Sequence, residues 1–179
     1  MTRPWGEYRK MSHAKASLFF SQASKGSRSL LMERKLVVRQ CSYMGKRRRL
    51  SWVVVEGPTI VSNSCNYIAE SRCDLPLEVL EVLLNSCVLD WFFRTTSTNN
   101  HVGNYEVEQL PVPTLSKETM TEITEYGRQL RETYRREPFR ASGRPQWDLE
   151  RELDKYVLQL YGANRQWRES LLRLYYEGD

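Results

Sequence analysis

Residues 83–113, LLNSCVLDWFFRTTSTNNHVGNYEVEQLPVP, decide the fold of this chain. The segment up to residue 93 is almost wholly apolar, which predicts a buried helix that ends in Trp-Phe-Phe. A polar loop follows over residues 95–104, and an extended Leu-Pro-Val-Pro run closes the segment. A rigid helix that presents a polar loop is typical of a surface that binds another molecule.

The buried helix is predicted to start at residue 75 and to run without a break to residue 93. Asp74 is suited to cap it, and Pro76 is suited to its first turn. Apolar residues cover most of its circumference, so little of it can face water. We expect Asn85 and Ser86, which interrupt that pattern, to be half-buried and to hydrogen-bond neighbouring backbone groups.

Three β-strands are predicted before this helix. Residues 35–42 and 50–56 are rich in branched apolar residues, and a Gly-Pro turn signal follows the second run. A third strand begins at residues 59–62 and continues or restarts at residues 66–69. Short strands joined by turns favour an antiparallel meander. The expected fold class is therefore α+β, with a small antiparallel sheet and a buried helix.

The chain after residue 113 is predicted to form a helical hairpin or a three-helix cap on the sheet. Helices are expected over residues 116–137, 148–161 and 165–176, with capping signals at Ser116, Gly162 and Asn164. A coiled protein–protein seam is the alternative for the first of them.

Two of these helices have faces that the spacing predicts. On the last helix, the residues expected to point inward are Trp167, Leu171, Leu174 and Tyr175. On the middle helix, a solvated acidic face is expected from Asp148, Glu150, Glu152 and Asp154.

Charge is distributed unevenly along the chain. Residues 1–50 contain 13 Lys and Arg against 2 Asp and Glu, whereas residues 51–116 contain 2 against 8. Residues 117–179 contain 12 of each kind. A basic N-terminal third attracts a polyanion such as nucleic acid, and the equal alternative is a solvated basic arm without a fixed partner.

These patterns divide the chain into three parts. Residues 1–32 form a basic lead that we expect to be irregular, apart from a short helix near residues 29–33. Residues 33–113 form a sheet–helix domain, and residues 114–179 form a helical C-terminal region.

Four consecutive cations are the most suggestive basic feature: Lys46, Arg47, Arg48 and Arg49. They lie between two predicted strands, so we expect them at a hairpin tip that contacts phosphates, and arginine can also read guanine. The alternative is a solvated turn that protects a sheet edge, because like charges repel and prefer water.

The loop over residues 95–104 supplies hydrogen-bonding groups and one apolar residue, Val102. Asparagine can pair with adenine, and threonine can bond a base edge or a phosphate. A loop whose asparagines only make turns is the competing interpretation.

Three separated runs resemble one protein family. They are Leu84-Asn85-Ser86 with its polar loop and Leu-Pro-Val-Pro, the run ERKLVVRQ at residues 33–40, and LDKYVLQLYG at residues 153–162. In this order they resemble the C-terminal specificity (target-recognition) domain of adenine-specific DNA methyltransferases, as found in fused TaqI-like type II restriction–modification enzymes.

The resemblance implies a module that reads duplex DNA while another domain or subunit catalyses methylation with S-adenosylmethionine. The Asn-Pro-Pro-Tyr signature of that catalytic domain is absent from this sequence, so no cofactor is expected in the chain. The residues expected to face DNA are Arg39, Gln40, Lys46, Arg47, Arg48, Arg49, Asn63, Thr98, Asn99, Asn100, His101 and Asn104.

Other classes of function find little support in the sequence. No glycine-rich nucleotide loop follows a strand, and no nucleophile–base set has motif context. The four cysteines form no CxxC pair and the two histidines lie far apart, so we expect reduced, buried or half-buried thiols rather than zinc ligands. Without a membrane-spanning run or a signal peptide, the cytoplasm is the expected location.

Two further readings stay open. The chain can be an interaction subunit that docks a partner enzyme through its C-terminal helices and has only nonspecific affinity for nucleic acid. It can also be an RNA-binding protein, although its aromatic residues mostly occupy core-like positions. An independent enzyme has the least support.

Overall fold

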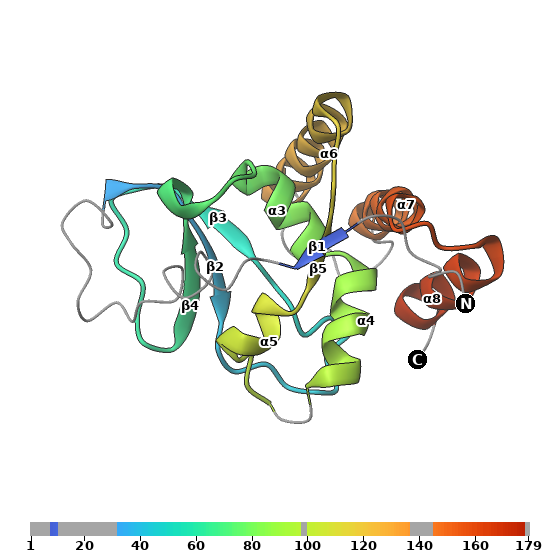
Figure 1. Cartoon of the computed structure of the whole chain (residues 1–179), viewed down its shortest axis with the longest axis horizontal. Helices are drawn as coiled ribbons and strands as arrows, with labels where there is room; N and C mark the ends of the chain where they lie inside the picture. The colour runs from blue at the N-terminus through green and yellow to red at the C-terminus, as the bar shows by residue number, and fades with distance from the viewer. Residues whose placement is uncertain (1–7, 11–31, 98–99, 137–144, 178–179) are drawn as a thin grey trace.

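The computed structural model describes residues 8–10, 32–97, 100–136 and 145–177, and it is α+β as predicted (Figure 1). The strands are β1 (Tyr8–Lys10), β2 (Lys35–Arg39), β3 (Val53–Val55), β4 (Cys65–Ala69) and β5 (Pro111–Pro113). The helices are a 3-10 turn η2 (Glu70–Arg72), α3 (Leu77–Leu84), α4 (Cys87–Thr96), α5 (Asn104–Glu108), α6 (Lys117–Arg136), α7 (Pro145–Leu160) and α8 (Arg165–Tyr176).

The main sheet is antiparallel, with strand order β3-β2-β4. The predicted meander is wrong, because it would have placed the second strand in the centre. Leu36 of β2 instead pairs with Val54 on one side and with Ile68 on the other. No strand forms at residues 59–62, which lead across to the far side of β2. The central position suits β2 because both of its faces pack against apolar residues.

The two faces of this sheet pack against different clusters. Leu36, Val38 and Ile68 are buried in the main core together with the helices. On the alternate positions, Tyr67 and Ala69 form a smaller cluster with residues from neighbouring strands and loops. Because side chains of a strand alternate between faces, both clusters follow from the sequence of β2 and β4.

The predicted single helix over residues 75–93 is two helices, α3 and α4. Pro76, not Asp74, occupies the N-cap of α3. The break falls at Asn85 and Ser86, because Ser86 caps α4 by accepting a hydrogen bond from the backbone of Leu89. Both polar residues hydrogen-bond backbone groups, as predicted. Asn85 is half-buried as expected, but Ser86 is buried, and the two residues separate two helices instead of lying within one.

The capping signals of the C-terminal helices are confirmed. Ser116 accepts from the backbone of Thr119 at 3.2 Å, and Asn164 accepts from the backbone of Trp167 at 2.9 Å. Gly162, with a φ of 67°, ends α7, and this left-handed conformation favours glycine. The middle helix begins earlier than predicted, at Pro145.

One predicted face of these helices needs correction. Leu171 and Tyr175 of α8 are buried, but Leu174 is 61% exposed and Leu172 points inward instead. The apolar stripe of α8 is therefore rotated by part of a turn, since α8 packs against both α4 and α7.

Residues 8–10, expected to be irregular, form β1 and pair antiparallel with β5. Tyr8 lies opposite Pro113, and Lys10 lies opposite Pro111. Prolines donate no ladder hydrogen bond, so a two-stranded ribbon of this kind accommodates them. The helix expected near residues 29–33 lies mostly outside the described residues.

The layers are visible in Figure 1: α3 and α4 lie beside the main sheet, and α7 and α8 lie beyond α4 on the side away from it. Helix α6 packs on α3 through Ile123 and Gly127, both buried. In the described parts of the chain, no helix has the length and apolar character needed to cross a membrane.

Candidate nucleic-acid interface

The four cations at residues 46–49 do not form the solvated tip that the sequence predicts. Lys46 is exposed, but the side chain of Arg48 is only 12% exposed and Arg49 is buried. Arg47 is half-buried. The expectation of a phosphate-contacting tip is therefore wrong for Arg48 and Arg49, and the solvated-turn alternative is wrong for them too.

The guanidinium of Arg48 meets a carboxylate from the C-terminal helices. It donates to Asp154 of α7 at 2.6 Å and to the hydroxyl of Tyr176 of α8 at 2.6 Å. It also donates to the backbone carbonyl of Asn85 at the α3–α4 break. Burial alone would lower the pKa of Arg48, but Asp154, Tyr176 and Glu150 raise it well above its ordinary value. Arg48 therefore stays charged inside the protein.

Arg47 makes a second link to the same helices. Its guanidinium lies 2.5 Å from Glu150 and stacks 4.6 Å from the ring centroid of Trp147. Glu150 and Asp154 were expected on a solvated face of α7, and that expectation is wrong for both. Arginines that were predicted to contact DNA thus pair with carboxylates that were predicted to face solvent.

Asp90 of α4 fixes the backbone of the same segment. Its fully buried carboxylate accepts from the backbone amides of Arg49 and Leu50 at 2.6 and 2.7 Å. It also accepts from Arg94 at 2.6 Å and from the hydroxyl of Tyr175 at 2.7 Å. Four donors on one buried carboxylate hold residues 49–50 against α4 and α8.

Arg94, at the end of α4, holds the turn that carries Lys46. It donates to the backbone carbonyls of Met44 at 3.0 Å and of Lys46 at 2.6 Å. The turn itself closes with a hydrogen bond from the amide of Lys46 to the carbonyl of Tyr43. Tyr43 and Met44 are consequently displayed outward, 69% and 48% exposed.

The amide-rich loop is shorter than the sequence predicts. Helix α4 continues to Thr96, and α5 begins at Asn104, where the side chain of Glu106 accepts from the backbone of Gly103 at 2.8 Å. Val102 is buried, as its apolar character predicts. Thr98 and Asn99 lie outside the described residues.

The two segments that were predicted to face DNA lie side by side. Cys41 and His101 form an antiparallel bridge, the amide of Ser42 donates to the carbonyl of Asn100 at 2.8 Å, and Val102 donates to Gln40 at 2.6 Å. The turn at Asn63 joins the same end of the sheet, because the amide of Gln40 donates to the carbonyl of Ser64 at 2.9 Å.

We name this surface the recognition edge. It runs along the lower border of Figure 1, where β2 ends and α5 begins. Its exposed members are Arg39, Cys41, Tyr43, Met44, Lys46, Asn63, Asn100, His101 and Tyr105. This set includes two permanent cations and no carboxylate, so it suits an anionic partner.

Two predicted site residues, Gln40 and Asn104, are half-buried and not exposed on this edge. Gln40 donates through its side chain to Asn66 at 2.8 Å, and Asn66 donates to the carbonyl of Val102 at 2.9 Å. Asn104 is half-buried as the first residue of α5. Gln40 therefore anchors the loop that carries His101 rather than presenting its amide to a ligand.

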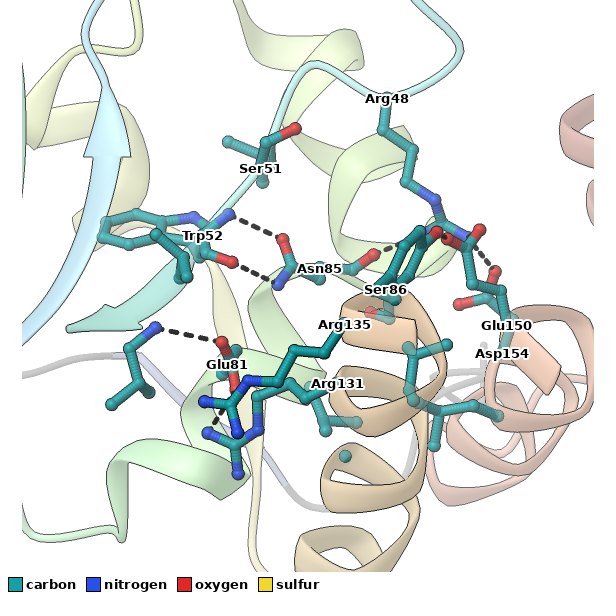
Figure 2. Close-up of a pocket in the computed structure, with 18 of the residues that line it drawn as sticks. Arg48, Ser51, Trp52, Glu81, Asn85, Ser86, Arg131, Arg135, Glu150 and Asp154 are labelled. Atoms are coloured by element: carbon teal, nitrogen blue, oxygen red, sulfur yellow. Dashed lines mark hydrogen bonds and ion pairs between the residues drawn. The ribbon is translucent and has the colours of Figure 1, made fainter. Parts of the chain in front are cut away.

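A cavity of about 630 Å³ lies elsewhere, between the β3 segment and helices α3, α6 and α7 (Figure 2). Figure 2 shows the amide of Asn85 pairing with both backbone groups of Trp52, at 2.7 and 2.8 Å, and Arg131 beside Glu81. Its charged lining residues are Arg47, Arg48, Arg131 and Arg135 against Glu56, Glu81, Glu150 and Asp154. Because the charges balance, the cavity itself does not attract a polyanion.

Sequence reasoning missed several residues of the edge. Tyr43 and Tyr105 are exposed, and neither was singled out from the sequence, where most aromatic residues were expected at core-like positions. Cys41 is exposed, although the thiols were expected to be buried or half-buried. The position of Cys41 two residues after β2, beside Arg39 and Gln40 that were predicted to face DNA, is the signal that could have indicated its exposure.

Comparison with known proteins adds no family. No protein-family model matches the sequence, and no curated protein is significantly similar to it. Among the described residues, no group of three or more His, Cys, Asp or Glu side chains could hold a metal ion.

Proposed function

We propose that this chain is a sequence-specific duplex DNA recognition module of an adenine-specific DNA methyltransferase or restriction–modification system. The recognition edge is the surface that contacts DNA. Catalysis and S-adenosylmethionine belong to a separate domain or subunit, as the resemblance implies.

One observation carries this proposal: segments about sixty residues apart, both expected to face DNA, meet at one exposed edge. Hydrogen bonds between backbone groups fix this meeting, so the edge is preorganised before any ligand binds. Arg39 and Lys46 supply charge, whereas Asn63 and Asn100 supply amides that can bond base edges.

Different residues of the recognition edge supply positive charge and hydrogen-bonding groups. Lys46, at the tip of the turn that Arg94 holds, is suited to a phosphate contact. Asn100 lies where the loop crosses the end of β2, and its amide is suited to adenine. Arg48 and Arg49 support the edge from inside and contact no DNA.

The docking alternative would use the outer faces of the C-terminal helices. On α7 and α8 the inner faces are occupied by Arg47, Arg48 and Asp90, whereas Leu174 is exposed on the outer face of α8. Single-stranded RNA gains one argument, because the exposed rings of Tyr43 and Tyr105 can stack on bases.

Selection from a randomised duplex library, with single-stranded RNA as competitor, tests the proposal. The expected result is a recovered duplex motif that Asn100→Ala changes or relaxes, with little change in nonspecific affinity. A recovered single-stranded motif would favour the RNA reading. Retention of the same motif by Asn100→Ala and Asn63→Ala together would move the site away from the recognition edge.

A further inference from the structure

Cys41 and His101 form an exposed thiol–imidazole pair within the recognition edge. The Sγ atom of Cys41 lies 3.6 Å from Nδ1 of His101, which is hydrogen-bond distance for sulfur. Both residues are exposed, so a small reagent can reach the sulfur. A thiol beside an imidazole is the arrangement that activates cysteine as a nucleophile, because the ring nitrogen accepts the thiol proton.

The backbone holds this pair in place. Cys41 and His101 are opposite each other in an antiparallel bridge, and hydrogen bonds of 2.8 and 2.6 Å flank them on both sides. Beneath the loop, the buried guanidinium of Arg49 lies 3.5 Å from the backbone carbonyls of Ser97 and His101. The register therefore places the two side chains opposite each other, within reach of the observed contact.

Two of the other cysteines, Cys73 and Cys87, have environments that suppress reaction. Cys87 is buried, and burial with the nearby Asp154 raises its pKa well above the ordinary value. Burial, Asp74 and Glu70 raise the pKa of Cys73 to about 12. Cys65 is half-buried at the start of β4. Thiolate is the reactive form of cysteine, so Cys73 and Cys87 serve as unreactive internal references.

We propose that Cys41 is a nucleophilic modification site, activated by His101 and open to hydroperoxides and alkylating electrophiles. A group added to its sulfur would stand beside His101 on the recognition edge. Modification then blocks the surface that contacts DNA, a consequence that rests on the proposed function.

The reaction with hydrogen peroxide balances without a cofactor. The thiol proton moves from Sγ to Nδ1 of His101, and the sulfur attacks one peroxide oxygen. A bond between sulfur and oxygen forms, the O–O bond breaks, and the leaving oxygen takes the proton from Nδ1 as water departs. Cysteine is oxidised to the sulfenic acid while the peroxide is reduced, and a thiol can later restore the cysteine.

Site-resolved alkylation of the full chain with iodoacetamide tests the activation. At neutral pH, Cys41 is expected to react at least about 10-fold faster than Cys65, and Cys73 and Cys87 are expected to stay unmodified. His101→Asn should lower the Cys41 rate about 10-fold at neutral pH. At a pH above 9, where hydroxide deprotonates exposed thiols, the variant should match the wild type.

The strongly alkaline rate is the control for an altered loop, because a displaced Cys41 would change its rate at every pH. Equal rates for Cys41 and Cys65, or an unchanged neutral rate in both His101→Asn and His101→Gln, would overturn the proposal. Peroxide treatment followed by dimedone should label Cys41, and Cys41→Ser should abolish that label.

Protection by DNA separates this inference from the proposed function. Bound duplex is expected to slow alkylation of Cys41, and alkylated protein is expected to lose DNA binding that protein carried through the same treatment without iodoacetamide retains. A reactive Cys41 that duplex DNA does not protect would preserve the modification site and reject its place in the DNA interface.

Discussion

Arg48 carries its charge inside the protein, and its partners come from three separate elements. Asp154 lies on α7, Tyr176 on α8, and the carbonyl of Asn85 at the α3–α4 break. Removing one member of a buried pair leaves the other charge without compensation, which is far costlier than losing an exposed pair. The residue that resembled a DNA contact is thus a link between the sheet domain and the C-terminal helices.

Replacing Arg48 by alanine is expected to lower the free energy of unfolding by about 3–5 kcal/mol. Arg151→Ala is the matched control, since Arg151 pairs with Glu177 on the surface, with side chains 45% and 48% exposed. That change should cost at most about 1 kcal/mol. Urea unfolding of both variants measures the difference, and equal losses would show that the Arg48 pair is not buried in solution.

The buried carboxyl group of Glu81 is expected to make the stability of the fold depend on pH. Burial raises its pKa above the ordinary 4.5, although the backbone amide of Val54 and the guanidinium of Arg131 oppose the shift. Between the unfolded and the folded pKa, the native state binds more protons than the unfolded state. Stability from this group is therefore highest at low pH and falls as pH rises through that window.

Glu81→Gln keeps an acceptor for Val54 and cannot ionise. Its stability relative to wild type is expected to increase as pH is raised from about 4 to about 7. Urea unfolding of both proteins across this range measures the change. The contributions of all other carboxyl groups to the pH dependence cancel in the difference, because both proteins contain them. A relative stability that decreased over the range would contradict the sign.

At the scale of elements, the contact between α3 and α6 is closer than side chains usually allow. A Cβ atom placed on Gly127 would lie 2.8 Å from Cγ2 of Val82. Valine is stiff at χ1 and Val82 is buried in the core, so it has little room to move. Glycine at this position is therefore a packing requirement, although glycine is otherwise unfavourable within a helix.

Gly127→Ala is expected to destabilise the protein by about 1–3 kcal/mol through overpacking, despite the better helix propensity of alanine. Val82→Ala removes the opposing methyl groups, so the double variant should lose less than the sum of the two single losses. Thermal unfolding of the four proteins gives the coupling. If the two single losses add in the double variant, or if Gly127→Ala is more stable than the wild type, then α3 and α6 are not in close contact at this point.

The sequence predicted the features that local residues determine. It failed for features that depend on contacts with residues far away in the chain. The caps at Ser116 and Asn164 and the glycine after α7 are local features, and all three are confirmed. The strand order was wrong because periodicity reports burial and not neighbours. The helix break at Asn85 and Ser86 was missed because the apolar pattern continues across it, and the partner of the Asn85 side chain, the backbone of Trp52, lies 33 residues away.

The candidate site was predictable in part for the same reason. Arg39, Asn63 and Asn100 are exposed, as residues that were predicted to face DNA must be. The inward direction of Arg48 and Arg49 depends on Asp154 and Asp90, which no local pattern connects to them. Runs of cations therefore indicate a surface only when no buried carboxylate lies within reach.

At the scale of the whole molecule, the recognition edge carries its permanent positive charge at two positions, Arg39 and Lys46. Lys46→Ala is expected to weaken binding to all duplex sequences about equally and to reduce the slope of log affinity against log salt by about 1. Lys155→Ala is the control, because Lys155 is an exposed lysine of α7 that lies beside Glu152. Fluorescence anisotropy over a salt series measures both, and equal slopes for the two variants would remove Lys46 from the interface.

The proposed location of a DNA contact on the recognition edge is the central claim, and an NMR titration of the chain with a short duplex tests it most directly. Backbone amide shifts are expected to change at residues 39–46, 63–64 and 100–105, while those on the outer faces of α7 and α8 stay constant. Shift changes confined to α6, α7 and α8, with none along the recognition edge, would contradict the account and place the contact on the helical region.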